Sequence, residues 1–353
     1  MNKSHILPLT SIRFFAAIFV LFSHLDFFKN TPFYFIYVKE GFIGVTLFFI
    51  LSGFVLSYSY QEKLLSGEKN KFAFYTARIA RIYPLHILTL LFTLFFLYQN
   101  ESIKEILSNI FLLQALIPKA SYYFSLNAPS WSISVELFFY LCFPFLITKS
   151  SKTLIKITVI ILILKILLSE INISEKATHA YIYISPILRL PDFIIGILIF
   201  RLRFNKLNVN ISTYQVVIVQ TLSICLFLLF IYYSHMVNIK YRFDIYYIIP
   251  MSILIISLSY SNGIITKTLS NKTLVLLGES SFSLYMIHQL IIRFIIENKT
   301  FFGSNFYMLS SILAISIFGS IFIYKYYELP MKKIVVNLLK KYKSKGNLIP
   351  FII

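Results

Sequence analysis

Histidine, carboxylate and arginine side chains inside apolar stretches are the residues of this sequence most able to do chemistry. Arg13 and His24 share one apolar run, and on a helix their spacing puts them on nearly the same side, about 16 Å apart. Glu136 closes the segment W-S-I-S-V-E, which opens at Trp131. If Trp131 lies at the outer interface of a membrane, Glu136 and His24 lie at similar depth and can pair, which would raise the basicity of the imidazole. The alternatives are a histidine satisfied by lipid headgroups and a structural ion pair.

Two arginines in the segment R-I-A-R, Arg78 and Arg81, have the spacing of one helix face. Guanidinium groups arranged in this way can bind a phosphate through forked hydrogen bonds. The alternative is that both arginines mark the membrane boundary and extend their charged ends toward headgroups.

Three further polar residues fall inside apolar runs. Arg189 and Asp192 are three residues apart and can neutralise each other, so we interpret them as a structural pair. His288 ends the segment S-F-S-L-Y-M-I-H and is either functional or a hydrogen-bonded residue of a helix bundle. The sequence contains no metal-ligand spacing, no G-x-S-x-G nucleophile elbow and no nucleotide-binding glycine loop.

The elements that must position these residues are predicted to be membrane-spanning helices. Hydrophobic residues make up 58% of the chain and charged residues only 13%, against about 25% charged in soluble proteins. The net charge of +19 comes from loops and from the C-terminal tail, which indicates membrane topology and anionic lipid rather than nucleic acid. Cys142 and Cys225 lie in apolar runs and are interpreted as buried hydrophobic residues. The first apolar run lacks a cleavage pattern and is expected to remain as a span.

The hydropathy pattern predicts an all-α bundle of ten spans, with a membrane domain over 1–330 and a short basic tail over 331–353. The spans are expected at 9–28, 41–60, 84–99, 131–148, 153–169, 182–200, 213–233, 245–260, 274–296 and 307–326. The apolar stretch 103–117 is short and is predicted to be an interfacial or re-entrant helix. The loops of one side carry 19 Lys and Arg residues and those of the other side 8, which predicts that both termini are cytoplasmic and that the tail lies on the inner leaflet. Gly41, Gly44 and the pair Ser52–Gly53 are expected to permit close helix packing.

Taken together, these motifs resemble the acyltransferase-3 family of integral membrane acyltransferases, over most of the chain from Leu9 to about Pro330. The resemblance is carried in order by six motifs: Arg-x10-His (Arg13, His24), F-F-I-L-S-G-F (Phe48 to Phe54), Arg-x-x-Arg (Arg78, Arg81), W-S-x-S-x-E (Trp131 to Glu136), L-G-x-x-S-F-S-x-Y-x-x-H (Leu277 to His288) and E-x-P (Glu328, Pro330).

The resemblance implies transfer of an acyl group, usually acetyl, from a cytoplasmic acyl-CoA to a hydroxyl of a surface glycan or related acceptor. The expected site residues are His24 and Glu136 for catalysis and Arg13, Arg78 and Arg81 for acyl-CoA, with Ser52, Arg189 and His288 as further candidates. His24 would act as general base or carry the acyl group transiently. No bound cofactor or metal is expected, and acetyl-CoA would be a co-substrate.

The chain looks like the stand-alone members of the family that act on O-antigen or similar polysaccharides, because no hydrolase-like domain follows the tenth span. It would reside in the bacterial inner membrane, with lipids and a lipid-linked or surface polysaccharide as partners and without nucleic acid. The main rival function is a transporter or flippase of lipid-linked sugars, in which the buried ionisable residues line a path. A polysaccharide polymerase is a second rival, although it would be expected to have larger outer loops.

Overall fold

The computed structural model describes residues 6–25, 34, 38–97, 100–171, 174–207 and 211–344, and for residues 175, 176, 206 and 342–344 the backbone only. The described residues form helices joined by short connections and contain no strand, so the predicted all-α fold is confirmed. The longer helices are α1 (Leu7–Ser23), α2 (Gly44–Leu56), α4 (Lys71–Phe96), α7 (Ser130–Leu146), α8 (Ser151–Glu170), α10 (Pro186–Arg201), α11 (Thr213–Tyr232), α13 (Ile245–Leu258), α16 (Ser281–Glu297), α18 (Asn305–Ile323) and α19 (Leu329–Ser344).

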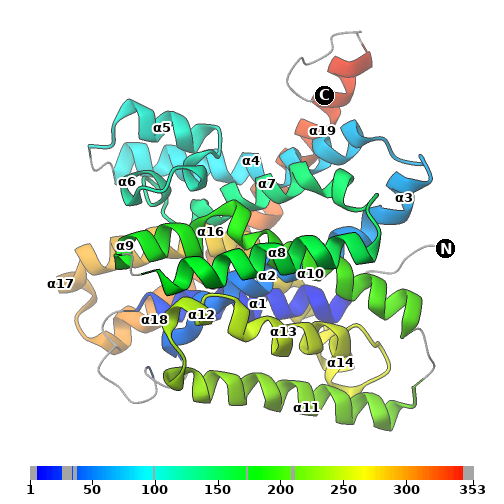
Figure 1. Ribbon diagram of the computed structural model, residues 1–353. Coiled ribbons are helices and arrows are strands. Elements are labelled where there is room, and N and C mark those ends of the chain that lie inside the picture. The colour runs from blue at the N-terminus through cyan, green and yellow to red at the C-terminus, as the bar shows by residue number, and fades with distance from the viewer. Residues whose placement is uncertain are drawn as a thin grey trace.

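Short helices gather at the two ends of the bundle. One end in Figure 1 carries α3 (Glu62–Leu65) and α14 (Ile264–Leu269), on the same side as the N-terminus. The opposite end carries α5 (Ile103–Ile110), α6 (Ala120–Tyr123), α9 (Glu175–Thr178), α12 (Ile239–Arg242) and α17 (Lys299–Phe302). The connections between successive long helices thus alternate between the two ends, in the same two sets for which Lys and Arg were counted in the sequence.

Within the described residues, six helical segments are long and apolar enough to cross a bilayer: Lys39–Leu65, Lys71–Phe96, His179–Asn205, Thr213–Met236, Ile239–Leu258 and Asn305–Lys341. α15 (Lys272–Glu279) and α16, which are bent by 60° relative to each other, add a seventh if the pair forms one span. α1 and α7 are apolar but have only 17 residues each, and α8 carries three lysines. Each of the ten predicted spans thus corresponds to a helix or a bent pair. The length and composition of the helices support a multi-pass membrane protein with six or seven spans, and the count of ten stays a prediction.

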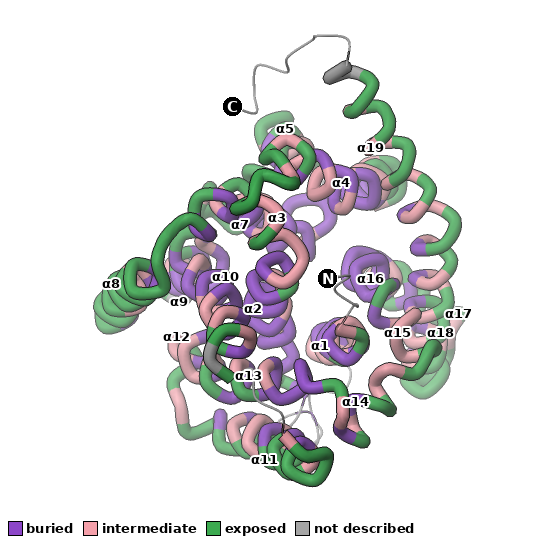
Figure 2. The backbone as a smooth tube through the Cα atoms, turned by 90° about the vertical axis from the view of Figure 1, so that its right-hand side faces the viewer, coloured by how far each residue is buried: buried purple, intermediate pink, exposed green. Residues whose placement is uncertain are grey.

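The centre of the bundle is formed by helices that approach one another closely at glycines. A Cβ atom on Gly53 of α2 would overlap the carbonyl oxygen of Phe193 in α10, and one on Gly196 of α10 would overlap that of Ile50. Gly41 likewise lies against the backbone of α1. Figure 2 shows α2, α10 and α16 as mostly buried, and the contacts at these glycines confirm the close packing predicted for them.

Helices at the periphery present apolar side chains to the surroundings. On α8, Leu167 is 59% exposed, on α11 Leu222 is 63% exposed, and on α18 Phe318 is 73% exposed. Each such side chain would cost about 1.5–3 kcal/mol to leave in water. Apolar surface on several outer helices therefore indicates a hydrocarbon environment.

α5, which lies in the stretch predicted to be interfacial, also exposes apolar side chains and buries a polar one. Its Ile103 and Leu107 are exposed, whereas Asn109 is fully buried and donates a hydrogen bond of 2.5 Å from Nδ2 to Ser125 Oγ. The helix covers 103–110 and is followed by a 3-10 turn, Gln114–Leu116, so it is shorter than the predicted 103–117 segment. Apolar residues outside and polar residues inside suit a helix that lies against lipid.

The C-terminal tail begins as a helix rather than as an extended segment. α19 follows α18 through Tyr324–Glu328 and packs against α4. Its start at Leu329 lies close to the predicted domain boundary at 330, while Lys345 and the rest of the tail lie outside the described residues.

We expect the two ends of the bundle to face opposite sides of the membrane, with the α3 end in the cytoplasm. The exposed residues Ser66, next to α3, and Ser304, next to α17, form a matched pair for labelling. In a Cys142→Ser/Cys225→Ser background, an impermeant maleimide added to spheroplasts should label Ser304→Cys and not Ser66→Cys, and lysis should expose both. Labelling of Ser66→Cys before lysis would overturn this orientation.

Candidate active site

A cavity of about 110 Å³ lies among α1, α2, α4, α7 and α16. Its walls are largely apolar, with Phe48, Phe49 and Phe282 among the lining residues. The polar lining residues are Arg13, Ser52, Arg78, Arg81, Ser132, Glu136, Tyr140, Ser281 and Tyr285. Five of the eight residues predicted from the sequence therefore meet at one cavity: Arg13, Ser52, Arg78, Arg81 and Glu136.

α4 brings both arginines of the Arg-x-x-Arg segment to this cavity. The helix begins at Lys71, where Asn70 caps it by accepting a hydrogen bond of 2.8 Å from the backbone N–H of Ala73. The predicted span began at residue 84, but Pro84 lies inside α4. Arg78 and Arg81 are thus held on a rigid helix and not in a loop.

The arginines are positioned by aromatic and acidic partners. Arg78 donates to Tyr60 Oη at 2.9 Å and lies over the rings of Tyr60 and Tyr140. Arg81 forms an ion pair with Glu328, a buried carboxylate that also accepts a 2.9 Å hydrogen bond from Ser283 Oγ.

Sequence reasoning noted Glu328 only as part of the E-x-P motif and did not place it in the site. A signal was available, because an acidic residue just after an apolar run must find a cationic partner when it is buried.

Glu136 is held by two hydroxyl groups. Tyr140 donates to its Oε1 at 2.5 Å and Ser52 donates to the same oxygen at 3.1 Å. Trp131, near the start of α7, is 4% exposed and packs against Phe49 and Tyr183. The hydrogen-bond partners described for Glu136 are thus Ser52 and Tyr140, and its pairing with His24 stays a prediction.

The charges around the cavity favour an anion. Three guanidinium groups (Arg13, Arg78 and Arg81) face two carboxylates (Glu136 and Glu328), and Arg13 interacts electrostatically with Arg81 and with both carboxylates. Arginine stays protonated under all physiological conditions. With both carboxylates ionised, one positive charge remains for a ligand.

His24 and His288 meet next to this cavity, although neither is among its described lining residues. Their rings lie 5.4 Å apart, and Gln289 Nε2 lies 3.4 Å from both ring nitrogens of His24. His288 Nδ1 lies 2.6 Å from the Tyr285 carbonyl oxygen. Tyr285 in turn lines the cavity and accepts a 2.9 Å hydrogen bond from Ser132 Oγ. Tyr285 thus connects the histidine pair to the cavity.

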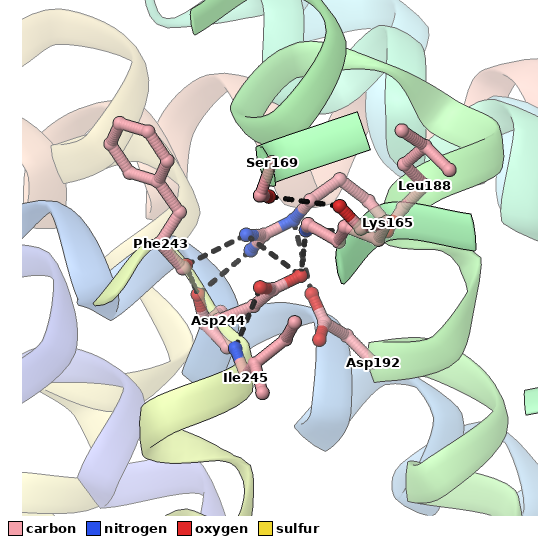
Figure 3. Close-up of polar contacts among 9 residues, drawn as sticks. Lys165, Ser169, Leu188, Asp192, Phe243, Asp244 and Ile245 are labelled. Atoms are coloured by element: carbon pink, nitrogen blue, oxygen red, sulfur yellow. Dashed lines mark hydrogen bonds and ion pairs between the residues drawn. The ribbon is translucent and has the colours of Figure 1, made fainter. Parts of the chain in front are cut away.

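Arg189, the remaining candidate, belongs to a separate buried cluster. Its Nε lies 3.0 Å from Asp192 Oδ2, which confirms the predicted pair, and its Nη1 lies 3.7 Å from Asp244 Oδ2. Lys165 forms an ion pair with the same Asp244. Figure 3 shows Lys165, Asp192 and Asp244 converging from α8, α10 and the start of α13. The two positive and two negative groups are all fully buried, and their charges balance. We therefore interpret the cluster as a structural ion-pair network that holds α8, α10 and α13 together.

We expect Asp244→Asn to destabilise the protein, because Lys165 and Arg189 would lose their shared counter-charge inside the bundle. Removing one member of a buried ion pair costs about 3–5 kcal/mol. The fraction of monodisperse protein that survives heating in detergent should fall for Asp244→Asn and recover in Lys165→Met/Asp244→Asn. Glu170→Gln is the matched control, since Glu170 accepts its hydrogen bond from Tyr241 at the surface. Equal survival of Asp244→Asn and Glu170→Gln would contradict this structural role.

Among the described residues, no group of three or more histidine, cysteine and carboxylate side chains is placed to hold a metal ion.

Comparison with known proteins gives a family for the chain. The family described as an acyltransferase domain matches residues 9–325. Acyltransferase MdmB of Streptomyces mycarofaciens is 34% identical over 151 residues, which are 38% of this chain and 38% of that protein. Peptidoglycan O-acetyltransferase OatA of Listeria monocytogenes is 25% identical over 378 residues, covering 98% of this chain and 59% of that protein.

The chain thus spans less than two thirds of the length of these relatives. No solved structure matches it significantly. The family match nevertheless runs through every helix that lines the cavity and includes all eight candidate residues. On this evidence the chain belongs to the acyltransferase-3 family.

Proposed function

We propose that this protein is a membrane O-acyltransferase that moves an acyl group, acetyl in the first instance, from a cytoplasmic acyl-CoA to a hydroxyl of a surface glycan such as O-antigen. The observation that carries the proposal is the convergence of Arg13, Arg78 and Arg81 on one cavity with apolar walls. Guanidinium groups suit the phosphates of CoA, and apolar walls suit its pantetheine arm. The family and the O-acetyltransferase activity in the name of one relative support the same reaction.

The donor would enter from the end of the bundle that carries α3. Arg78 lies one turn from Arg81 on α4, and the two together can hold a diphosphate. Arg81 keeps Glu328 as a partner, and its remaining N–H donors would face the ligand. The acyl end would then extend past Arg13 and Ser52 toward Tyr285.

The transfer step exchanges a thioester for an ester. His24 takes the proton of the acceptor hydroxyl, whose oxygen forms a bond to the thioester carbonyl carbon. The carbon–sulfur bond breaks, and the CoA thiolate leaves and takes up the proton. A covalent variant would pass the acyl group through His24 before the hydroxyl attacks. Glu136, held by Ser52 and Tyr140, would serve the donor side by balancing the charge of Arg13.

The acceptor would be reached from the opposite end of the bundle, where α1 ends at His24. Such a division of donor and acceptor requires a protein that spans the membrane, and the bacterial inner membrane provides acetyl-CoA on one side and glycan precursors on the other. A lipid-linked or polymeric polysaccharide would be the physiological acceptor.

The experiment that tests the proposal uses purified protein in lipid nanodiscs with acetyl-labelled acetyl-CoA. CoA release should rise when a mixed panel of bacterial polysaccharides is added, and the label should appear as an alkali-labile ester on one of them. A transporter or flippase would release no CoA and would move labelled lipid-linked sugar across proteoliposomes. Transport of labelled sugar without CoA release would rule out the acyltransferase function and support the transporter or flippase.

A further inference from the structure

The outer half of α16 presents polar side chains next to His24. Gln289 is half-buried, and its amide nitrogen lies 3.4 Å from either ring nitrogen of His24, whose side chain is exposed. Arg293 follows one helical turn further from the cavity, on the same face of α16. These three residues form a polar strip at the end of the bundle where α1 stops.

Arg293 is held in place without being neutralised. Its Nη2 donates a 3.3 Å hydrogen bond to the carbonyl oxygen of Leu97, the C-cap of α4, and the side chain is half-buried. No carboxylate among the described residues lies within 4 Å of its guanidinium nitrogens. The other N–H groups and the positive charge remain to be matched by a ligand.

A second observation at the same place points to a missing partner. His288 is fully buried behind His24, and its Nε2 has no hydrogen-bond partner in the described part of the chain. Burying a polar atom without a partner is unfavourable, because the hydrogen bonds it made to water are not replaced. Such an atom is expected where a ligand completes the hydrogen bonding.

We infer that Gln289 and Arg293 form the acceptor subsite beside His24, and that the subsite takes a glycan bearing a carboxylate or phosphate near the hydroxyl that reacts. The inference rests on the proposed function and names its acceptor class. Four residues of helix separate the two side chains by about 6 Å, roughly the width of one sugar ring. A hydroxyl held at His24 by the Gln289 amide would therefore place an anionic group of the same or the adjoining sugar at Arg293.

The test compares matched acceptors that differ only in charge: methyl uronosides, the corresponding neutral methyl glycosides and their 6-phosphates. The variant is Arg293→Gln, which keeps a donor for the Leu97 carbonyl and removes the charge. We expect kcat/KM for the charged acceptors to fall by about 10- to 150-fold, as for loss of a charge-assisted hydrogen bond. The neutral acceptors should change by less than about twofold, and the KM for acetyl-CoA should stay unchanged.

Two further variants serve as controls for this measurement. Arg293→Lys keeps the charge and should restore most of the loss on phosphate and less on carboxylate, because lysine cannot make the fork. Lys299→Ala removes an exposed positive charge at the same end and should leave every acceptor unaffected. Equal losses on charged and neutral acceptors in Arg293→Gln would assign Arg293 to packing or to a lipid headgroup and overturn the inference.

Failure of the proposed function has a different signature. It would be seen as absence of acceptor-stimulated CoA release in the unmodified protein. Saturation-transfer NMR with the same uronosides and neutral glycosides still tests the subsite in that case. Preferential contact with the uronoside that is lost in Arg293→Gln supports the subsite, and indifference to charge rejects it.

Discussion

His24→Gln is expected to reduce acyl transfer to glycan by about 10²- to 10⁴-fold, the usual contribution of a positioned general base. Glutamine has similar size and hydrogen-bonding groups, but it cannot take up a proton near neutral pH. The level of inserted protein should not change, because the His24 side chain is exposed and contributes little to the packed core. The measurement is labelled acetate on the acceptor per nanodisc-embedded protein, with CoA release recorded in parallel.

His235→Gln is the matched control for this substitution. His235 is also exposed and lies near Tyr232, away from the cavity, so transfer should remain at the original level. Transfer by folded His24→Gln within about tenfold of the unmodified protein would rule out both the general-base role and the acyl-carrier role. His288, whose ring lies 5.4 Å away, would then be the residue to test.

The sequence predicted the elements well because apolar periodicity and the need for glycine at close crossings are local properties. It predicted the positions of spans better than their lengths. The helix containing Arg78 begins 13 residues before the predicted span, because its polar first turns fall outside the apolar run from which the span was predicted. α1 and α7 are shorter than about 20 residues, and no local pattern shows that neighbouring helices surround them.

Residues of the candidate site could be predicted from the sequence only where an ionisable side chain falls inside an apolar run. Arg13, Arg78, Arg81 and Glu136 could be found because burying a charge is costly, and the cavity brings all four together. The sequence could not predict which of these side chains pair, because pairing depends on the rotation and depth of each helix. The contacts of Glu136 with Ser52 and Tyr140 are an example of such pairing.

The same limit explains why Lys165 and Asp244 were missed as partners of Arg189. Lys165 was a visible signal inside an apolar run, whereas Asp244 lies at the boundary of a predicted span, where an acidic residue is unremarkable.

Arg78→Ala and Arg81→Ala are each expected to weaken acetyl-CoA binding by about 10- to 150-fold, from loss of a charged hydrogen bond worth about 1.5–3 kcal/mol. The double variant should bind more weakly than either single variant. The two losses need not add fully, because both side chains would hold one diphosphate. Equilibrium binding of labelled acetyl-CoA to nanodisc-embedded protein measures the dissociation constant without requiring transfer.

Lysine and glutamine substitutions separate a phosphate-binding role from a topological one. Arg78→Lys keeps the positive charge required for orientation but lacks the fork, so it should recover only part of the affinity. Glu328→Gln removes the charge that holds Arg81 and leaves the arginine present, so acetyl-CoA affinity should fall less than in Arg81→Ala. Arg201→Ala is the control, since Arg201 donates to the carbonyl oxygens of Ile147 and Lys149 and does not line the cavity. If the folded double variant binds acetyl-CoA as tightly as Arg201→Ala does, Arg78 and Arg81 are markers of the membrane boundary and the donor site lies elsewhere.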